Sequence, residues 1–424
     1  MNEVKEKKKL GLTTKIFISL IAGAIVGIVL NMFAADVDFV QNVLVNGVFY
    51  VVGQGFIRLM QMLVVPLVFC SLICGATAIG DSKTLGKVGV KIIGFYIFTT
   101  MMAVAVALGI GLLIKPGMGL DMSQIQTAEV TASSDSVSFA ETLLNIIPKN
   151  PIGALANGEM LQVIVFALIV GVILAKLQDK TQLVTNFFQQ GNDIMMEMTM
   201  MVMGLAPIGV FCLIAKTFAG LGFSAMVPMF KYMGAVLLAL VIQCCGVYQI
   251  LLALLTRLNP LRFLKKFAPV MGFAFSTATS NATIPMNIDT LEEKIGVNRR
   301  ISSFTIPLGA TINMDGTAIY QGVCVIFIAT CFGVDLTIGQ QLTIILTATL
   351  ASIGTAGVPG AGMIMLAMVL QSVGLPVEGI ALVAGIDRIF DMGRTTVNIT
   401  GDAACTLCVS KMEEKRQAQK KTEA

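Results

Sequence analysis

Long apolar runs separated by short polar connections dominate the chain. Ten such segments can be marked: 16–33, 48–79, 88–114, 161–175, 195–219, 232–255, 267–288, 304–330, 342–370 and 380–408. The first holds about 18 residues, which is close to the roughly 20 that cross a bilayer as a helix and more than the roughly 7–15 of a signal-peptide core. The pattern therefore predicts an all-α integral membrane protein.

The positions of lysine and arginine in the connections predict the orientation of the chain, because short cytoplasmic loops carry an excess of both. The connections after the second, fourth and sixth segments are basic, through Lys83, Lys87, Lys176, Lys180, Arg257, Arg262, Lys265 and Lys266. The connections after the first, third and fifth segments contain fewer lysine and arginine residues. We therefore expect a multi-pass protein of the cytoplasmic (inner or plasma) membrane with both termini in the cytoplasm.

The seventh and ninth segments break this alternation. The seventh has basic residues on both sides, whereas the ninth has none on either side, so each is predicted to begin and end on one side of the membrane. Polar or glycine-rich stretches interrupt them at 276–283 and 354–362, and non-helical backbone at membrane depth must be buried in protein or line a cavity. The prediction is eight transmembrane helices plus two oppositely oriented re-entrant hairpins, an inverted repeat of the kind that transporters use around a binding site.

Composition excludes several classes of protein. The chain is 56% hydrophobic and 13% charged, far from the usual mixture of a water-soluble domain. Its net charge of +4 is not arranged as a basic stripe with aromatic residues, so no nucleic acid is expected as a partner. Histidine is absent, and the pair Cys405 and Cys408 has no second pair to complete a metal site.

The last segment carries a polar face. Asp387, Asp391, Arg394, Asn398 and Asp402 follow one another at intervals of three or four residues. At about 100° per residue they lie within roughly 80° of one another. A charge at the bilayer centre costs at least about 2.5–3.5 kcal/mol, so this face predicts a functional site. Internal salt bridges, such as Asp391 with Arg394, are the alternative interpretation.

The eighth segment contains Asn313, Asp315 and Gly316. Residues two apart point to nearly opposite sides of a regular helix, so Asn313 and Asp315 can face one cavity only where the helix unwinds. Gly316 favours such a break, which would free backbone carbonyls. Amide, carboxylate and carbonyl oxygens suit an alkali cation better than zinc or copper.

Several of these stretches resemble the signatures of the glutamate transporter family, also called the dicarboxylate/amino acid:cation symporter family. They are 313–317 (NMDGT), 354–362 (GTAGVPGAG), 391–398 (DMGRTTVN), 62–68 (MLVVPLV) and 206–210 (APIGV), and the resemblance covers nearly the whole chain. It implies a homotrimer with an elevator mechanism. The scaffold and trimerisation part would be residues 1–255, with helices 3 and 6 moving with the transport core of residues 256–412. A charged cytoplasmic tail, 413–424, would follow.

The resemblance also implies binding residues. Arg394 would bind the side-chain carboxylate of an acidic amino acid and Asp391 its ammonium group. The full substrate set is Ser280, Thr317, Val358, Asp391, Arg394, Thr395 and Asn398. Cation ligands fall into three sets: Gly309, Asn313, Asn398 and Asp402; Thr311, Ser352, Ile353 and Thr355; and Tyr96, Thr99, Thr100, Asn313 and Asp315. The second arginine that some relatives place at the positions of Ala278 or Met392 is missing, and Arg388 is present instead.

The expected function is therefore sodium-coupled symport of L-glutamate or L-aspartate, not enzymatic catalysis. Na⁺ is the expected coupling ion, and H⁺ is the alternative. Within the family, carriers of C4-dicarboxylates, neutral amino acids or cystine are alternatives, although a dicarboxylate has no ammonium group for Asp391. Outside the family, an ion channel or a membrane scaffold would give a similar apolar pattern. The expected partners are the amino acid, the lipid bilayer and two further copies of the chain.

Overall fold

The fold is seen in a computed structural model that describes residues 11–34, 37–80, 86–120, 144, 147–222, 226–355, 361–384 and 386–422. Within these ranges the chain forms helices and connections and no strand, which confirms the all-α prediction. The predicted substrate residue Val358 lies outside the described residues.

Six helical runs in the described ranges are long and apolar enough to cross a membrane. They are Thr14–Ala34, Val40–Thr77, Gly89–Ile114, Gln162–Gly204, Met226–Thr256 and Ile301–Cys331. Apolar side chains on the first run face outward, as Ile21 and Ile25 do with more than half of their surface exposed. Such a face is stable in contact with acyl chains. The predicted number of eight crossings stays a prediction.

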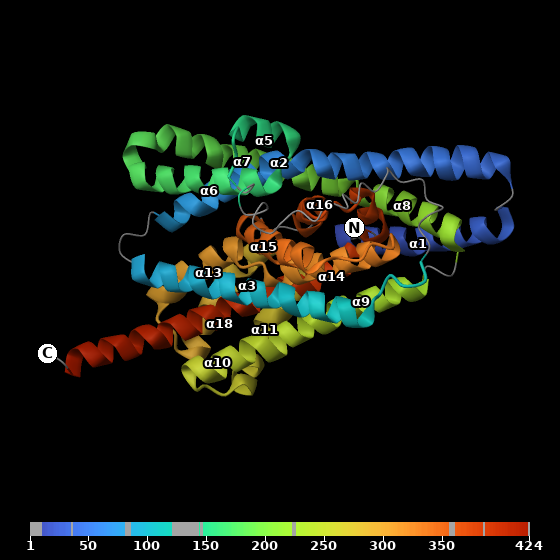
Figure 1. Ribbon diagram of the computed structural model, residues 1–424. Helices are drawn as coiled ribbons and strands as arrows, with labels where there is room; N and C mark the ends of the chain where they lie inside the picture. The colour runs from blue at the N-terminus through green and yellow to red at the C-terminus, as the bar shows by residue number, and fades with distance from the viewer. Residues whose placement is uncertain are drawn as a thin grey trace, which may run out of the picture.

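One group of helices forms an outer layer. It contains α1 (Leu12–Ala34), a π-helical turn (Val40–Phe49), α2 (Tyr50–Gly80), α5 (Pro151–Asn157), α6 (Met160–Leu177), a 3₁₀ turn (Gln178–Thr181), α7 (Gln182–Gly204) and α8 (Ala206–Leu221). The helix α2 packs along α6, α7 and α8, and α1 packs on α8 (Figure 1).

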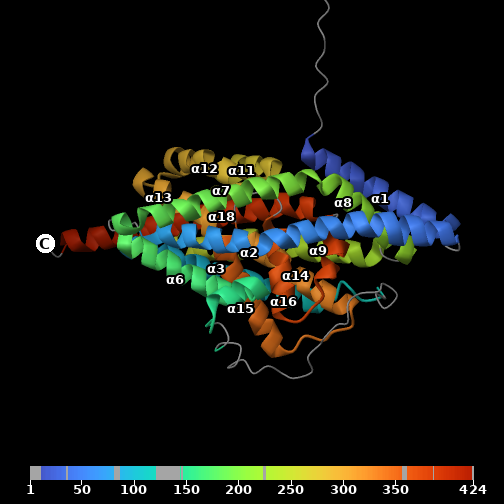
Figure 2. The same cartoon turned by 90° about the horizontal axis from the view of Figure 1, so that it is seen from above.

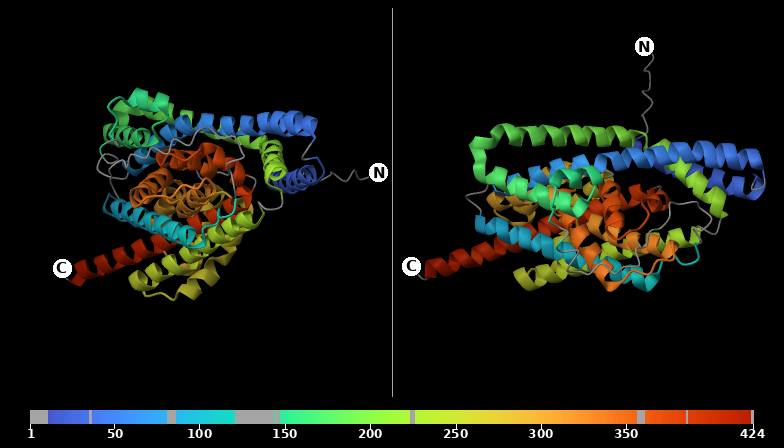
Figure 3. Two further views of the ribbon diagram at one scale, coloured as in Figure 1. Left: turned by 45° about the vertical axis from the view of Figure 1, so that its right-hand side comes forward. Right: turned by 45° about the horizontal axis from the view of Figure 1, so that its top comes forward.

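The remaining helices form a second group around α14 (Asp315–Cys331). They are α3 (Gly86–Ile114), α9 (Met226–Val241), a π-helical turn (Ile242–Val247), α10 (Tyr248–Thr256), α11 (Pro260–Thr277), α12 (Ser280–Asp289), a π-helical turn (Thr290–Ile295), α13 (Arg299–Ile312), α15 (Ile338–Gly354), α16 (Ala361–Ser372), a 3₁₀ turn (Val377–Gly379), α17 (Ile380–Ala384) and α18 (Asp387–Thr422). In the left view of Figure 3 the orange segments lie between the blue and green helices on one side and the yellow helices on the other, while the red helix α18 projects at its C-terminal end.

The helix α14 is the centre of the second group. It packs against α3, α9, α15, α16 and α18, and nearly all of its residues are buried. The neighbouring helices therefore cover α14 on nearly every side. The polar side chains that α14 does carry are therefore enclosed by protein rather than by lipid.

The fifth helical segment begins earlier than the apolar pattern indicates. The prediction was 195–219, but α7 begins at Gln182, and α8 follows after a break at Leu205. Polar residues such as Gln189 and Asp193 interrupt the apolar pattern in the first part of α7, so a search for apolar runs does not detect it. The helix nevertheless packs on α2. Proline at the start of α8 fits the break, because proline suits the first turn of a helix.

Two helix pairs occupy the positions of the predicted hairpins. The backbone between α11 and α12 turns at Ala278, which has a φ of 51°, and continues extended through Thr279. The helix α11 contacts both α12 and the π-helical turn after it, so the pair is antiparallel. The helices α15 and α16 also pack against each other. That both pairs re-enter the membrane from opposite sides stays a prediction.

The helix α18 runs the length of the second group and projects beyond it at the C-terminal end (Figure 2). It continues through most of the predicted charged tail, as far as Thr422. An ion pair of 2.6 Å between Lys91 Nζ and Glu413 Oε1 ties this extension to α3. Along the bundle α18 packs against both α3 and α14.

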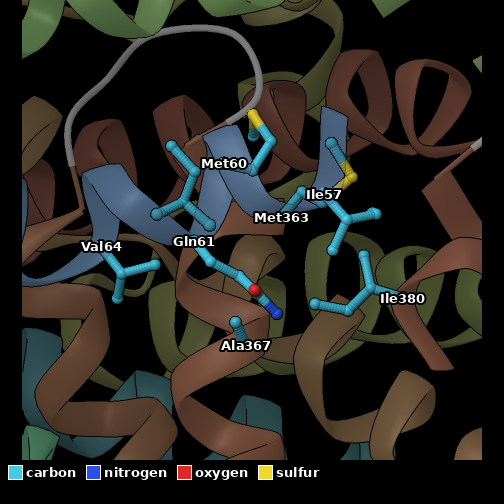
Figure 4. A pocket seen from close by; sticks show the side chains of 8 residues that line it. Ile57, Met60, Gln61, Val64, Met363, Ala367 and Ile380 are labelled. Carbon is cyan, nitrogen blue, oxygen red and sulfur yellow. The ribbon is translucent and has the colours of Figure 1, made fainter. Parts of the chain in front are cut away.

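The outer layer meets the second group where α2 crosses α16 and α17. Figure 4 shows this contact, with Gln61 of α2 reaching toward Ala367 of α16. The other lining side chains are apolar, among them Met60, Val64 and Met363, and they enclose a cavity of about 10 Å³. Such a surface has few polar bonds to break if the two groups slide past each other.

Candidate functional site

The helical path breaks between α13 and α14, where Asn313 and Met314 have left the helix. This confirms the predicted unwinding, but the break lies before Gly316 rather than at it. Gly316 is in the first turn of α14, and its backbone N–H donates a hydrogen bond of 2.7 Å to Asn398 Oδ1 of α18. The break turns Asn313 and Asp315 toward α18 and α3, which are the helices that carry their partners.

Gly316 also sets how closely α14 and α18 approach. A Cβ atom placed on it would lie 2.5 Å from the carbonyl oxygen and 2.7 Å from the Cα of Arg394. Both are backbone atoms, which cannot turn aside as a side chain can. The absence of a side chain at this position therefore brings the break in one helix against the arginine of the other.

We expect Gly316→Ala to destabilise the protein by about 1–3 kcal/mol, the usual range for an overpacked contact. The measurement is thermal unfolding of the purified protein in detergent. Gly272→Ala is the matched control, because a Cβ on this glycine of α11 meets nothing within 4 Å. Equal melting temperatures for the two variants would contradict the close approach of α14 and α18.

Arg394 lies at the centre of the polar face of α18, and only 1% of its surface is exposed. Its Nη1 is 3.0 Å from Asp387 Oδ1, and its Nη2 is 2.8 Å from Asp391 Oδ1. The guanidinium also stacks over the ring of Tyr320, 4.2 Å from the centroid. Its Nε has no hydrogen-bond partner among the described residues. The internal ion pair of Asp391 with Arg394, the alternative interpretation of this face, is present.

The second helix pair reaches the same guanidinium. A Cβ placed on Gly362, in the first turn of α16, would lie 2.8 Å from Arg394 Nη1 and 3.0 Å from Thr317 Cγ2. Thr317 is itself buried on α14. The structure thus brings together Thr317, Asp391 and Arg394 from the predicted substrate set and adds Gly362 as a neighbour that the prediction did not include.

The other described members of the substrate set are buried nearby. Thr395 donates to the carbonyl of Asp391 one turn earlier, at 2.8 Å. Asn398 faces α14, where it accepts from Gly316. Ser280 is buried at the start of α12, a helix that packs against α18, but in the described part of the chain it does not hydrogen-bond to Arg394.

Asp387 and Asp391 also border the outer layer. Both line a cavity of about 10 Å³ together with Phe56 of α2 and Ala206 of α8. This volume is close to that of one water molecule. In this conformation the acidic side chains are therefore enclosed, and Arg394 is paired within the protein.

All four members of the first predicted cation set meet in one place. Asn313 Nδ2 donates to Asp402 Oδ1 at 2.8 Å and to the carbonyl of Asn398 at 3.0 Å. A Cβ on Gly309 would collide with the carboxylate of Asp402. Among the described residues, Asp402 Oδ2 and Asn313 Oδ1 are buried without a hydrogen-bond partner. Two unsatisfied oxygens, one from a carboxylate, fit a hard cation, because such oxygens are costly to bury alone.

The third predicted set surrounds Asp315, which is fully buried. Thr100 Oγ1 donates to Asp315 Oδ1 at 2.5 Å and lies 2.8 Å from the carbonyl oxygen of Tyr96. Thr99 Oγ1 is 3.2 Å from the same carbonyl. These oxygens come from α3 and α14, and Asn313 is shared with the first set.

The second predicted set lies between the ends of α13 and α15. Ser352 Oγ donates to the carbonyl of Ile312 at 3.3 Å. A Cβ on Gly75 of α2 would lie 3.7 Å from Thr311 Cγ2 and 3.8 Å from the carbonyl oxygen of Ile353. Thr355 is buried directly after α15. The geometry therefore brings the second set together beside the outer layer.

Sequence reasoning missed three polar residues of these sites. Asp387 belongs to the polar face but was given no role, although it is an ion-pair partner of Arg394. Gln243 and Tyr248, in the sixth apolar segment, both donate to Asp315. The sequence did contain a signal for these two residues, because burying a polar side chain inside an apolar span costs free energy unless the side chain has a partner.

Comparison with known proteins adds an independent line of evidence. The model of the sodium:dicarboxylate symporter family matches residues 12–412. The chain is 36% identical to a proton/sodium-glutamate symport protein from Bacillus caldotenax, over 96% of this chain and 95% of that protein. It is 38% identical to a proton/glutamate-aspartate symporter from Bacillus subtilis, over 86% and 88% of the two chains. The corresponding symporter from Escherichia coli is 35% identical over 96% and 94%.

Proposed function

The chain belongs to the sodium:dicarboxylate symporter family, and from this premise we propose that it carries L-glutamate or L-aspartate across the cytoplasmic membrane together with sodium ions. Membership makes it a multi-pass membrane transporter rather than an enzyme. Relatives named for glutamate and aspartate support the substrate class. The observation that carries the proposal is a buried arginine on the same helix as Asp402, whose Oδ2 is, like Asn313 Oδ1, buried without a hydrogen-bond partner among the described residues.

Arg394 is the residue proposed to recognise the side-chain carboxylate of the substrate. A guanidinium offers a planar fork that matches a carboxylate, and here this fork is occupied by Asp387 and Asp391. An incoming carboxylate can take the place of one of these partners without leaving the arginine unpaired. The displaced Asp391 would then be available to the ammonium group of the same substrate.

The proposed set is completed by residues on several helices. Gly362 lies against the guanidinium and Thr317, so closely that a Cβ at this position would meet both. Ser280, Val358, Thr395 and Asn398 are proposed as the remaining contacts. Because α12, α14, α16 and α18 each contribute, binding would draw the two helix pairs together over the substrate.

Sodium is the proposed coupling ion. The first set, with its unsatisfied Asp402 Oδ2 and Asn313 Oδ1, would hold one ion, and the oxygens around Asp315 another. A bound cation would compensate the negative charge of these carboxylates in a low-dielectric interior. Since Asn398 contacts the break that carries Asn313, filling the cation sites would also order the substrate side of α18.

The proposed mechanism is an elevator within a homotrimer. Residues 1–255 would provide the scaffold, with α3, α9 and α10 moving as part of the transport core of residues 256–412. The packing of α3 and α9 on α14 supports this division. So does the apolar contact between α2 and α16, because it offers little resistance to sliding (Figure 4). Both termini would be cytoplasmic.

The test is uptake of labelled aspartate into proteoliposomes. We expect accumulation when an inward sodium gradient is imposed and little with a proton gradient in sodium-free buffer. Unlabelled glutamate should compete, whereas succinate, serine and cystine should compete poorly, because each lacks either a matching carboxylate or the single ammonium group. Equal uptake driven by protons without sodium would instead favour the proton-coupled alternative, and conductance without saturable uptake would indicate a channel.

A further inference from the structure

The sixth apolar segment, formed by α9, the π-helical turn and α10, sends two polar side chains to Asp315. Gln243 Nε2 donates to Asp315 Oδ2 at 3.1 Å, and Tyr248 Oη donates to the same oxygen at 2.7 Å. Both side chains are buried, and Tyr248 is entirely inaccessible to solvent. Nothing in the substrate and cation sets accounts for these two residues.

The orientation of the Gln243 amide follows from its surroundings. Its Nε2 lies 3.3 Å from the carbonyl oxygen of Thr99 as well as 3.1 Å from Asp315 Oδ2. Both neighbours can only accept, so the NH₂ end of the amide must face them. Gln243 thereby links Asp315 of α14 to Thr99 of α3, two residues from different helices of the same predicted cation set.

Tyr248 reaches Asp315 by crossing α18 at a glycine. A Cβ on Gly401 would lie 2.5 Å from Tyr248 Oη and 2.6 Å from Asn313 Nδ2. The tyrosine hydroxyl therefore lies beside the Asn313 amide, which binds Asp402, while it donates to Asp315. It thus contacts Asp315 directly and lies near Asp402 only through the Asn313 amide.

The two carboxylate oxygens of Asp315 have different hydrogen-bond partners. Each carboxylate oxygen has about two acceptor positions, and Gln243 and Tyr248 occupy both on Oδ2. On Oδ1 the donor is Thr100, whose single hydroxyl proton has a second acceptor in the carbonyl of Tyr96; the Thr99 hydroxyl, a further neighbour of the carboxylate, shares that carbonyl as an acceptor. If that proton turns to Tyr96, Oδ1 and the Thr100 oxygen both become available to a cation, while Oδ2 stays fixed.

We propose that Gln243 and Tyr248 are positioning residues that fix one oxygen of Asp315 so that the other is aimed at the coupling cation. They act through Asp315 and do not touch the ion. The inference rests on the proposed sodium-coupled function. Because both donors bind the oxygen that the ion does not use, their bonds persist with and without the ion, and their contribution is to hold the carboxylate in place.

The test is sodium binding in the absence of any amino acid, measured as the rise in melting temperature of the purified full-length protein with sodium concentration. Holding a side chain in one orientation is worth about 0.5–1.5 kcal/mol, so Tyr248→Phe should bind sodium roughly threefold to tenfold more weakly. Preference for sodium over lithium should also fall, because a loosened carboxylate adapts to a smaller ion. Aspartate affinity at saturating sodium should stay within about twofold, whereas a general packing defect would lower it.

Tyr232→Phe is the matched control, since it removes a buried hydroxyl from the same segment where the ring packs against Phe327 and Phe390. It should bind sodium as the wild type does. Gln243→Leu provides a second test of the same kind if Tyr248→Phe does not fold. Unchanged or tighter sodium binding by the variants, with a normal response of the wild type, would overturn the positioning role alone. A wild type that sodium does not stabilise would overturn the sodium-coupled function, and this inference with it.

Discussion

Replacing Arg394 with cysteine is expected to abolish binding and transport of acidic amino acids. The side chain is 1% exposed, so a substrate carboxylate brought to it would be buried without a counter-charge in the variant. Removing one partner of a buried ion pair costs about 3–5 kcal/mol, which corresponds to about two to four decades of affinity. The measurement is aspartate binding by isothermal titration calorimetry at saturating sodium.

The variant also loses the two internal ion pairs of Arg394, so folding needs its own control. Arg394→Cys/Asp387→Asn removes the charge that the arginine holds at 3.0 Å and should recover stability without recovering aspartate binding. Arg299→Cys, on an exposed arginine paired with Glu292, should keep normal affinity. A small neutral substrate such as serine loses no ion pair, and its sodium-dependent binding should become measurable. Near-normal aspartate affinity in folded Arg394→Cys would refute the assignment and make Arg388 the residue to test.

Asp402→Asn is expected to weaken the sodium dependence of aspartate binding by a factor of at least about one hundred. The two side chains have nearly the same shape, so packing is kept, but the negative charge is lost from a site where Oδ2 has no hydrogen-bond partner among the described residues. A buried charge partner worth about 3 kcal/mol or more accounts for that factor. The measurement is the sodium concentration that gives half-maximal aspartate binding.

Asp335→Asn is the matched control for this change. Asp335 is exposed in the connection between α14 and α15, so the same loss of charge there should leave the sodium dependence unaltered. If Asp402→Asn binds aspartate with the sodium dependence of the wild type, Asp402 is not a cation ligand. If it binds aspartate tightly without any sodium, the carboxylate acts against binding unless it is neutralised, which still places the ion beside it.

The sequence alone determined the fold class of the protein and the segments that contain its candidate site. Apolar runs of membrane-spanning length predicted an all-helical fold because the bilayer excludes unpaired backbone groups. Charged residues inside such a run are expensive, and this cost singled out the face of α18 that contains Asp391, Arg394 and Asp402. The break beside Asn313 was predicted for a similar reason, since two residues two apart face one cavity only in an unwound helix.

Only the tertiary structure decided which side chains meet. Asp387 and Asp391 are equally placed by periodicity, but their distances to Arg394 show that the arginine holds both. Tyr248 and Asp315 are 67 positions apart, and their contact depends on the crossing of α10 and α18 at Gly401. Helical periodicity determines the face on which a residue lies, because it is a property of one segment. The partner of that face depends on how the helices pack, and this follows from the shapes of many side chains together.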